Sequence, residues 1–263
     1  MRASVFLFLF SLLVCSVSSA QEACIPIPQI DVALTESQRL AAEIEWKRAI
    51  DQDKAEDIKR LLPGVNIRLT NEKGKTALMA AVKVGDQCLL QELLQRGLSI
   101  SDRGYTGGTT LMYAVLGNQP EMIDQVLSYK PDLNAQSTNG WTAVMIAAAK
   151  GFESAISVLH KAGADVNLAD VYEWTPLMRA LDNRHGAVVS YLLSLPDIDL
   201  ERVNENGSTA LHIAAKAGNK LAVEHLLQSG ASSAIKDKNG YSPAEIARQS
   251  NHFSVAEQIQ QAE

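Results

Sequence analysis

The chain has 263 residues and a formal net charge of −6, which is enough for one or two ordinary domains. No run of lysine or arginine stands out along it. This argues against nucleic-acid binding, which needs clustered cations that displace counterions. Binding to anionic lipid surfaces is disfavoured for the same reason.

The first 20 residues have the pattern of a secretory signal peptide. Arg2 gives a basic start, residues 5–14 are almost all apolar, and Ser18–Ser19–Ala20 supplies small residues for cleavage. This apolar run is too short to span a membrane. We therefore expect cleavage after Ala20 and no stable membrane insertion afterwards. We expect the mature protein in the periplasm, with the extracellular space as the alternative.

Residues 21–35 form an N-terminal extension that contains Cys24 and is interrupted by Pro26 and Pro28. After cleavage, Cys24 and Cys88 are the remaining cysteines, and an exported protein meets an oxidising compartment. A Cys24–Cys88 disulfide would close a loop in the unfolded chain and so raise the free energy of unfolding by about 4 kcal/mol. Two free or intermolecular thiols are the alternative. Both possibilities stay open here, because the sequence does not give the distance between the two residues.

Residues 36–70 are predicted to form a helical cap at the start of the folded domain, which covers residues 36–263. Its helices are expected near Glu36–Ile50 and Ala55–Leu62, with a break around Asp51–Asp53. The first helix carries many charges, as the solvated outer face of a terminal unit should.

One short pattern then recurs six times, at intervals of 33 residues and once of 34. Each copy begins with a hydroxyl residue that is predicted to cap a helix. These residues are Thr76, Thr109, Thr142, Thr175, Thr209 and Ser242. The repeats begin near residues 71, 104, 137, 170, 204 and 237, and each follows the order turn, short helix, turn, longer helix. Periodicity of this kind indicates stacked supersecondary units.

The repeats resemble the ankyrin repeat family over about residues 36–263. The period, the hydroxyl cap, the helix-ending Gly85, Gly151 and Gly218, and the segment Gly163–Ala164–Asp165–Val166–Asn167 carry this resemblance. It implies an all-α solenoid with short β-hairpin loops, made of an N-terminal helical cap and six repeats. It also implies a concave face of hairpins and first helices, which in this family usually binds another protein.

Two features depart from the family pattern. The ankyrin repeat family usually has histidine in the fourth position of the motif, and here only His212 keeps it. Methionine replaces this histidine at Met79, Met112, Met145 and Met178. We interpret these methionines as core residues, because equivalent positions about 10 Å apart could not share a metal ion. The fourth hairpin has Glu173 where the others have glycine. Either this hairpin is reshaped or it accepts strain of about 1–2 kcal/mol.

Large aromatic and charged residues gather on the inferred concave side, mostly in the middle repeats. Tryptophan, tyrosine and arginine dominate the energetics of many protein interfaces. We therefore predict a partner-binding patch there. Its candidate residues are Tyr105, Tyr113, Trp141, Lys150, Tyr172, Trp174, Arg179, Asp182, Asn183 and Tyr241. The alternative is that Trp141 and Trp174 pack flat on neighbouring hairpins and only stiffen the stack.

The sequence predicts an exported interaction module without catalytic activity. Its histidines are scattered over several repeats, and it has no phosphate-binding glycine loop and no nucleophile elbow. We expect a monomer, without cofactor or metal, that binds a folded protein. Similarity to secreted bacterial members of the family implies that it inhibits or regulates a periplasmic enzyme, such as a cell-wall hydrolase or a stress enzyme. The alternatives are a secreted effector that acts on a host protein and, more remotely, an enzyme.

Overall fold

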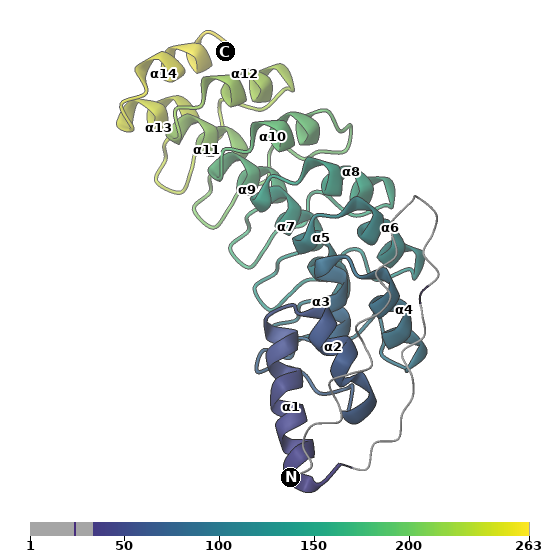
Figure 1. Ribbon diagram of the computed structural model, residues 1–263. Coiled ribbons are helices and arrows are strands. Elements are labelled where there is room, and N and C mark those ends of the chain that lie inside the picture. The colour runs from purple at the N-terminus through teal and green to yellow at the C-terminus, as the bar shows by residue number, and fades with distance from the viewer. Residues whose placement is uncertain (1–23, 25–33, 263) are drawn as a thin grey trace.

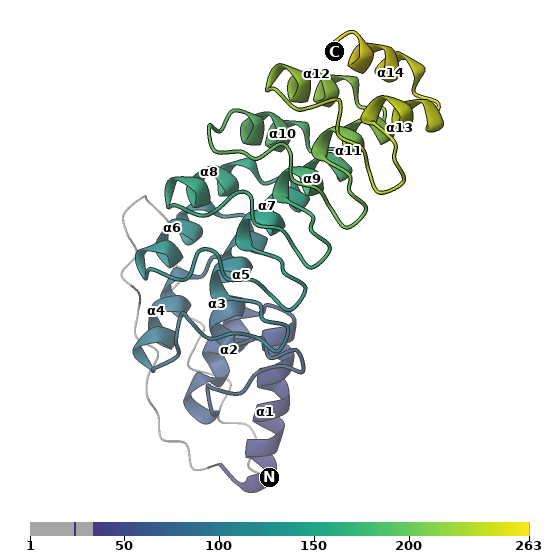
Figure 2. The ribbon, with the colours of Figure 1, turned by 180° about the vertical axis from the view of Figure 1, so that it is seen from behind.

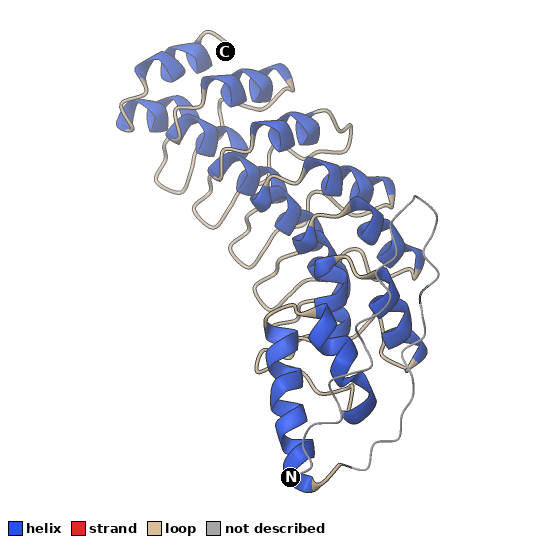
Figure 3. Cartoon of the chain, in the orientation of Figure 1, coloured by secondary structure: helices blue, strands red, loops and turns tan. Residues whose placement is uncertain are grey.

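The computed structural model describes residue 24 and residues 34–262. Pairs of helices stack into one curved row that runs from the N-terminal cap to the C-terminus (Figure 1). The described part of the chain has helices and no regular strand (Figure 3). One isolated bridge joins Arg103 and Thr109 in a hairpin. The predicted all-α repeat solenoid is confirmed, with hairpin loops that do not form strands among the described residues. The predicted signal peptide lies outside these residues.

The helices form two parallel rows behind the cap, as both views show (Figures 1 and 2). The cap consists of α1 (Glu36–Asp51), α2 (Ala55–Leu61) and the short 3-10 helix η1 (Leu62–Gly64). The first helices of the repeats are α3 (Ala77–Val84), α5 (Thr110–Gly117), α7 (Ala143–Lys150), α9 (Pro176–Asp182), α11 (Ala210–Lys216) and α13 (Pro243–Gln249). The second helices are α4 (Gln87–Gln95), α6 (Pro120–Ser128), α8 (Glu153–Lys161), α10 (Gly186–Leu193), α12 (Lys220–Gln228) and α14 (Phe253–Gln260).

The recurring hydroxyl residue starts each first helix. The Thr76 hydroxyl accepts a hydrogen bond from the Met79 N–H at 3.2 Å, which satisfies one free donor of the first turn. The same bond forms at Thr109, Thr142, Thr175 and Ser242. In the fifth repeat the Thr209 hydroxyl instead bonds to the His212 ring nitrogen Nδ1, at 2.9 Å.

A residue in the left-handed conformation follows each first helix within two residues of its end, nine residues after the cap. The six residues are Gly85, Asn118, Gly151, Arg184, Gly218 and Asn251. The sequence predicts this role for the three glycines. The asparagines and the arginine adopt the same conformation because the following turn has the same geometry in every repeat.

Small and flexible side chains fill the space between the first helices. The alanines of α3, α7 and α11 are largely buried, and neighbouring first helices pack directly on each other. At Gly117 a Cβ atom would lie only 2.3 Å from the Lys83 carbonyl oxygen, so these two helices approach to backbone contact. The four repeat methionines are buried. Their predicted role as core residues is confirmed.

Neighbouring hairpins are joined by one backbone hydrogen bond at every junction. In each case an amide of the later hairpin donates to a carbonyl of the earlier one. The bonds are Tyr105 to Lys73, Thr138 to Thr106, Val171 to Asn139, Glu205 to Tyr172 and Lys238 to Asn206, at 2.9–3.2 Å. The hairpins therefore form a continuous edge that projects from the row of first helices (Figure 1).

The fourth hairpin keeps the shape of the others despite its glutamate. Glu173 has φ 60°, and the equivalent glycines have φ values of 75–83°. The Glu173 N–H donates to the Asp170 carbonyl at 2.9 Å, just as the Gly140 N–H donates to that of Ser137. Of the two alternatives, the structure shows the strained turn rather than a reshaped hairpin.

Replacing Glu173 with glycine is expected to raise the free energy of unfolding by about 0.5–1 kcal/mol. Glycine removes the left-handed penalty of about 1–2 kcal/mol, and the greater freedom of glycine in the unfolded chain offsets part of the gain. Urea denaturation measures the change. Glu173→Gln removes the charge and keeps the Cβ atom, so it should leave stability unchanged. An equal gain in both variants would assign the effect to charge instead.

The cap is attached to the first repeat by a buried ion pair, and a disulfide ties the N-terminal extension to the same repeat. Lys75 has a largely buried side chain that pairs with Asp53 and donates to the Ile50 carbonyl at 2.8 Å. Burial lowers the pKa of Lys75, and the pairing with Asp53 partly opposes this. Cys24 is bonded to Cys88 near the start of α4, with their Cα atoms 5.2 Å apart. The ion pair fixes the cap against the end of the stack, and the disulfide encloses the cap in a covalent loop.

Among the described residues, no helix combines the length and apolar character needed to cross a membrane.

Candidate functional site

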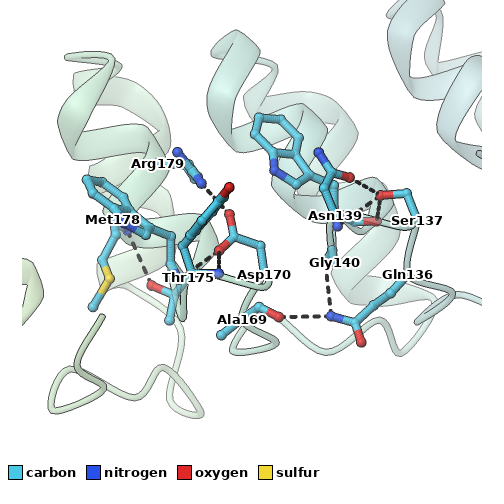
Figure 4. A network of polar contacts seen from close by, with 12 residues as sticks. Gln136, Ser137, Asn139, Gly140, Ala169, Asp170, Thr175, Met178 and Arg179 are labelled. Atoms are coloured by element: carbon cyan, nitrogen blue, oxygen red, sulfur yellow. Dashed lines mark hydrogen bonds and ion pairs between the residues drawn. The ribbon is translucent and has the colours of Figure 1, made fainter. Parts of the chain in front are cut away.

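Three of the predicted patch residues form one cluster between the third and fourth hairpins. The Arg179 guanidinium carbon lies 5.2 Å from the centre of the Trp141 ring and 4.7 Å from that of Trp174. Asp170 pairs with the same arginine (Figure 4). We call Trp141, Asp170, Trp174 and Arg179 the arginine cluster. Cation–π contacts with two rings hold the guanidinium between them.

The repeat register explains how these residues meet. Trp141 and Trp174 directly precede the caps of α7 and α9, and Arg179 lies in the first turns of α9. The residue before a cap therefore lies beside the first helix of its own repeat and beside that of the following repeat. Lys75 and Tyr113 show the same register two repeats earlier, with the Lys75 ammonium nitrogen 5.6 Å from the ring centre.

Asp170 holds the cluster to the hairpin backbone. Its side chain is fully buried, and its Oδ1 atom accepts from the backbone N–H groups of Tyr172 at 2.9 Å and Trp174 at 3.0 Å. Its Oδ2 atom pairs with Nη2 of Arg179. A buried charge needs such a partner. The carboxylate therefore shapes the hairpin and positions the arginine at the same time.

The neighbouring hairpin is also fixed by side-chain bonds (Figure 4). The Gln136 amide nitrogen donates to the carbonyls of Gly140 at 2.9 Å and Ala169 at 2.8 Å, so it joins two hairpins. The Ser137 hydroxyl accepts from the Trp141 N–H at 3.0 Å. These bonds hold the third and fourth hairpins in one arrangement beside the arginine cluster.

The other candidate residues lie around this cluster or farther along the stack. Tyr172 is 53% exposed at the tip of the fourth hairpin, and Tyr105 is 73% exposed two hairpins earlier. Tyr113 contacts Lys75 and not the cluster, and burial raises its pKa. Tyr241 lies at the last hairpin, away from the middle repeats. Lys150, Asp182 and Asn183 are exposed at the ends of α7 and α9.

Both tryptophans are partly exposed, which is compatible with the binding hypothesis and with the stiffening alternative. Their stacking on Arg179 stiffens the row, and their remaining surface is open to solvent. The assignment of all ten residues to partner binding stays a prediction.

Sequence reasoning missed Asp170 and Gln136. Asp170 occupies the hairpin position where Asn71, Asn204 and Asp237 also accept bonds from their own turns. That recurring Asx pattern could have identified its capping role. Its ion pair with Arg179 could not be predicted from the sequence, because it depends on how the hairpin folds back on the helix.

His212 has a structural environment, as predicted. Its side chain is buried, and its Nε2 atom lies 3.1 Å from the Tyr241 carbonyl oxygen. Burial lowers its pKa below the ordinary value of 6.5, and the bond to Tyr241 and the charge of Asp237 partly oppose this. Among the described residues, no group of three or more His, Cys, Asp or Glu side chains is arranged to hold a metal ion.

The His212 environment predicts a pH dependence of stability. The unfolded chain binds a proton on this ring as the pH falls through 6.5, before the folded chain does. The contribution of His212 to the free energy of unfolding is therefore complete above that pH. It is lost as the pH falls toward the lowered pKa of the folded protein. His212→Met, which copies the residue of four other repeats, should abolish this component. Urea denaturation of both proteins between pH 7 and pH 5 tests it, and parallel curves would contradict it.

The comparison with known families decides the identity of the fold. Three copies of the family described as ankyrin repeats match residues 47–137, 111–204 and 195–262. The chain belongs to the ankyrin-repeat family. An ankyrin stack is a protein-interaction scaffold.

Curated proteins match shorter parts of the chain. The human ARF GTPase-activating protein GIT1 is 46% identical over 55 residues, which are 21% of this chain and 7% of GIT1. The zinc finger CCCH domain-containing protein 24 of Oryza sativa subsp. japonica is 44% identical over 64 residues, 23% of this chain and 8% of that protein. This chain thus spans less than a tenth of the length of these curated relatives.

A solved structure matches over a longer range. It is the complex of the predatory endopeptidase Bd0816 from Bdellovibrio bacteriovorus with the immunity protein Bd3460. The matched chain has a TM-score of 0.63 and 27% identity to the present ankyrin protein. The match covers 71% of this chain and 98% of that one.

Proposed function

We propose that this ankyrin protein is exported and binds a folded extracytoplasmic enzyme, which it inhibits without catalysing a reaction itself. The proposed target class is an endopeptidase that acts on the cell wall, because the immunity protein Bd3460 is in complex with a predatory endopeptidase. The structural likeness over 98% of that neighbour is the observation that carries the proposal. The signal-peptide pattern of residues 1–20 supports export.

The arginine cluster supports the proposed binding mode. It combines two indoles, a guanidinium and a buried carboxylate on rigid elements. Rings and arginines of this kind often carry most of the binding energy of an interface. Their order in the free protein means that little conformational freedom is lost when a partner docks.

Crosslinking in the native cells, followed by mass spectrometry, identifies the partner. The purified pair then allows a binding assay and a hydrolysis assay on cell-wall peptides. We expect Trp174→Ala to weaken binding by roughly thirtyfold, as for a central anchor residue, and to relieve inhibition in proportion. Leu221→Ala is the matched control, because Leu221 is 71% exposed on α12 in the other helix row. Equal affinity of the two variants, both folded, would remove the cluster from the interface.

Two alternatives give different outcomes in the same experiments. Recovery in the medium or in a host cell, bound to a host protein, would favour a secreted effector. Faster hydrolysis in the presence of the pure protein would indicate an activator. Recovery of no folded partner under any of these conditions would contradict the proposed function.

A further inference from the structure

Three hairpin tips carry the same dipeptide, asparagine followed by glycine. The pairs are Asn139–Gly140, Asn206–Gly207 and Asn239–Gly240. Each glycine has a positive φ, between 76° and 83°. Its N–H donates to the carbonyl of the residue three positions earlier, at 2.8–2.9 Å. The three turns therefore share one backbone conformation and can be compared directly with one another.

An asparagine that precedes glycine can lose its side-chain amide without an enzyme. The backbone nitrogen of the glycine attacks Cγ of the asparagine, so that a new C–N bond forms. The bond between Cγ and Nδ2 breaks, and ammonia leaves with the former amide proton of the glycine. Water then opens the cyclic imide at either carbonyl, which gives aspartate or isoaspartate. Glycine favours the first step because it has no side chain to hinder its nitrogen.

The first two pairs are covered by the hairpin that follows them. The Asn139 carbonyl accepts from the Val171 N–H at 3.2 Å, and the Asn206 carbonyl accepts from the Lys238 N–H at 2.9 Å. A Cβ atom on the glycine of either pair would lie 2.7–2.8 Å from backbone atoms of that next hairpin. Formation of the imide requires the turn to open. At these two pairs the opening also breaks the bond to the next hairpin, which makes it less frequent.

The last pair lacks this cover. Among the described residues, no amide donates to the Asn239 carbonyl. A Cβ atom on Gly240 would meet nothing within 4 Å. Gly240 is exposed, whereas Gly207 is half-buried and Gly140 is buried. The attacking nitrogen is therefore least enclosed in the last hairpin.

Contacts of the asparagine side chains do not explain this difference. The Asn239 side chain hydrogen-bonds to the Asp237 carboxylate. The Asn139 Oδ1 atom likewise accepts from the Ser137 hydroxyl, at 2.6 Å. Each of these side chains is thus held by the first residue of its own turn. What separates the last pair from Asn139 is the missing hairpin beyond it.

We infer that Asn239 is a site of spontaneous deamidation in the folded protein, and that Asn139 and Asn206 are protected by the next hairpin. Opening the last turn breaks no bond to a following unit. The product carries one additional negative charge at the C-terminal end of the stack. As isoaspartate it also has one additional carbon atom in its backbone. This reaction is independent of the proposed function, because it needs neither a partner nor export.

The three pairs can be compared in one sample of the full-length mature protein. The protein is incubated at mildly alkaline pH, and peptide mass spectrometry measures the loss of each amide over time. We expect Asn239 to deamidate roughly fivefold faster than Asn139 and Asn206, because one backbone hydrogen bond and the packing of a hairpin are missing there. In denaturing urea the three rates should become similar. Equal rates in the folded protein would overturn the inference.

Two further measurements identify the reacting atoms. Asn239→Gln lengthens the side chain and disfavours the five-membered ring, so the acidic species that ion-exchange chromatography detects should largely disappear. Asn139→Gln is the matched control and should keep that species, and circular dichroism establishes that both variants are folded. By hydrogen exchange we expect a lower protection factor at Gly240 than at Gly140 and Gly207, because exchange requires the same turn bond to break. An unchanged acidic species in Asn239→Gln, or equal protection at the three glycines, would overturn the inference.

Discussion

Serine at both Cys24 and Cys88 is expected to lower the free energy of unfolding by about 4 kcal/mol. The disulfide closes a loop of 64 residues, and opening it returns that loop-closure entropy to the unfolded chain. The loop contains the whole cap, so the loss should fall mainly on the cap and the first repeat. Urea denaturation gives the total loss in the free energy of unfolding. Hydrogen exchange at Trp46 and Ile50 shows whether that loss falls on the cap.

The reduced wild-type protein is the control for this variant. Its denaturation curve should coincide with that of Cys24→Ser/Cys88→Ser, because both lack the same covalent link. The single variant Cys88→Ser should show the same loss under non-reducing conditions. A double-serine protein that is as stable as the oxidised wild type would show that the cap is held by non-covalent packing alone.

Asp53→Ala is expected to destabilise the protein by about 3 kcal/mol, since it removes one partner of a buried ion pair. The Lys75 side chain is only 6% exposed. Without Asp53, its ammonium group keeps one bond, to the Ile50 carbonyl, and an uncompensated buried charge is costly. Lys83, whose ammonium nitrogen lies 2.7 Å from the other Asp53 oxygen, also loses its partner.

A double variant separates the buried charge from other effects at this junction. Lys75→Met in the Asp53→Ala background removes the orphaned charge, and we expect it to restore most of the lost stability. Glu56→Ala is the matched control in the same cap, because Glu56 is 87% exposed beside Lys59. It should cost less than about 0.5 kcal/mol. Equal losses at Asp53 and Glu56 would refute the special role of the buried pair.

The repeat architecture could be predicted from the sequence because every unit repeats the same local signals. The hydroxyl caps and the terminal glycines fix where the first helices begin and end, and the methionines keep the spacing of core residues. These signals act within about ten residues, so periodicity alone reveals them.

The candidate site was predictable only in part. The positions of Trp141, Trp174 and Arg179 follow from the register, and the structure brings these three together. The role of Asp170 was not predicted, because one carboxylate oxygen caps a turn and the other reaches a helix, and no spacing rule describes both. The disulfide was left open at the sequence level because its two residues are 64 apart and only folded geometry sets their distance.

The bonds between hairpins all point the same way, and this makes the two ends of the array unequal. Each junction joins an amide of the later hairpin to a carbonyl of the earlier one. By the same register the last hairpin presents the Asn239 carbonyl, to which no amide of the described residues donates. A Cβ atom at Gly240 would touch nothing. An additional unit could therefore be appended after the sixth repeat and find an acceptor already in place. The stack is therefore open to extension at this end, whereas the cap packs on the first helix at the other end.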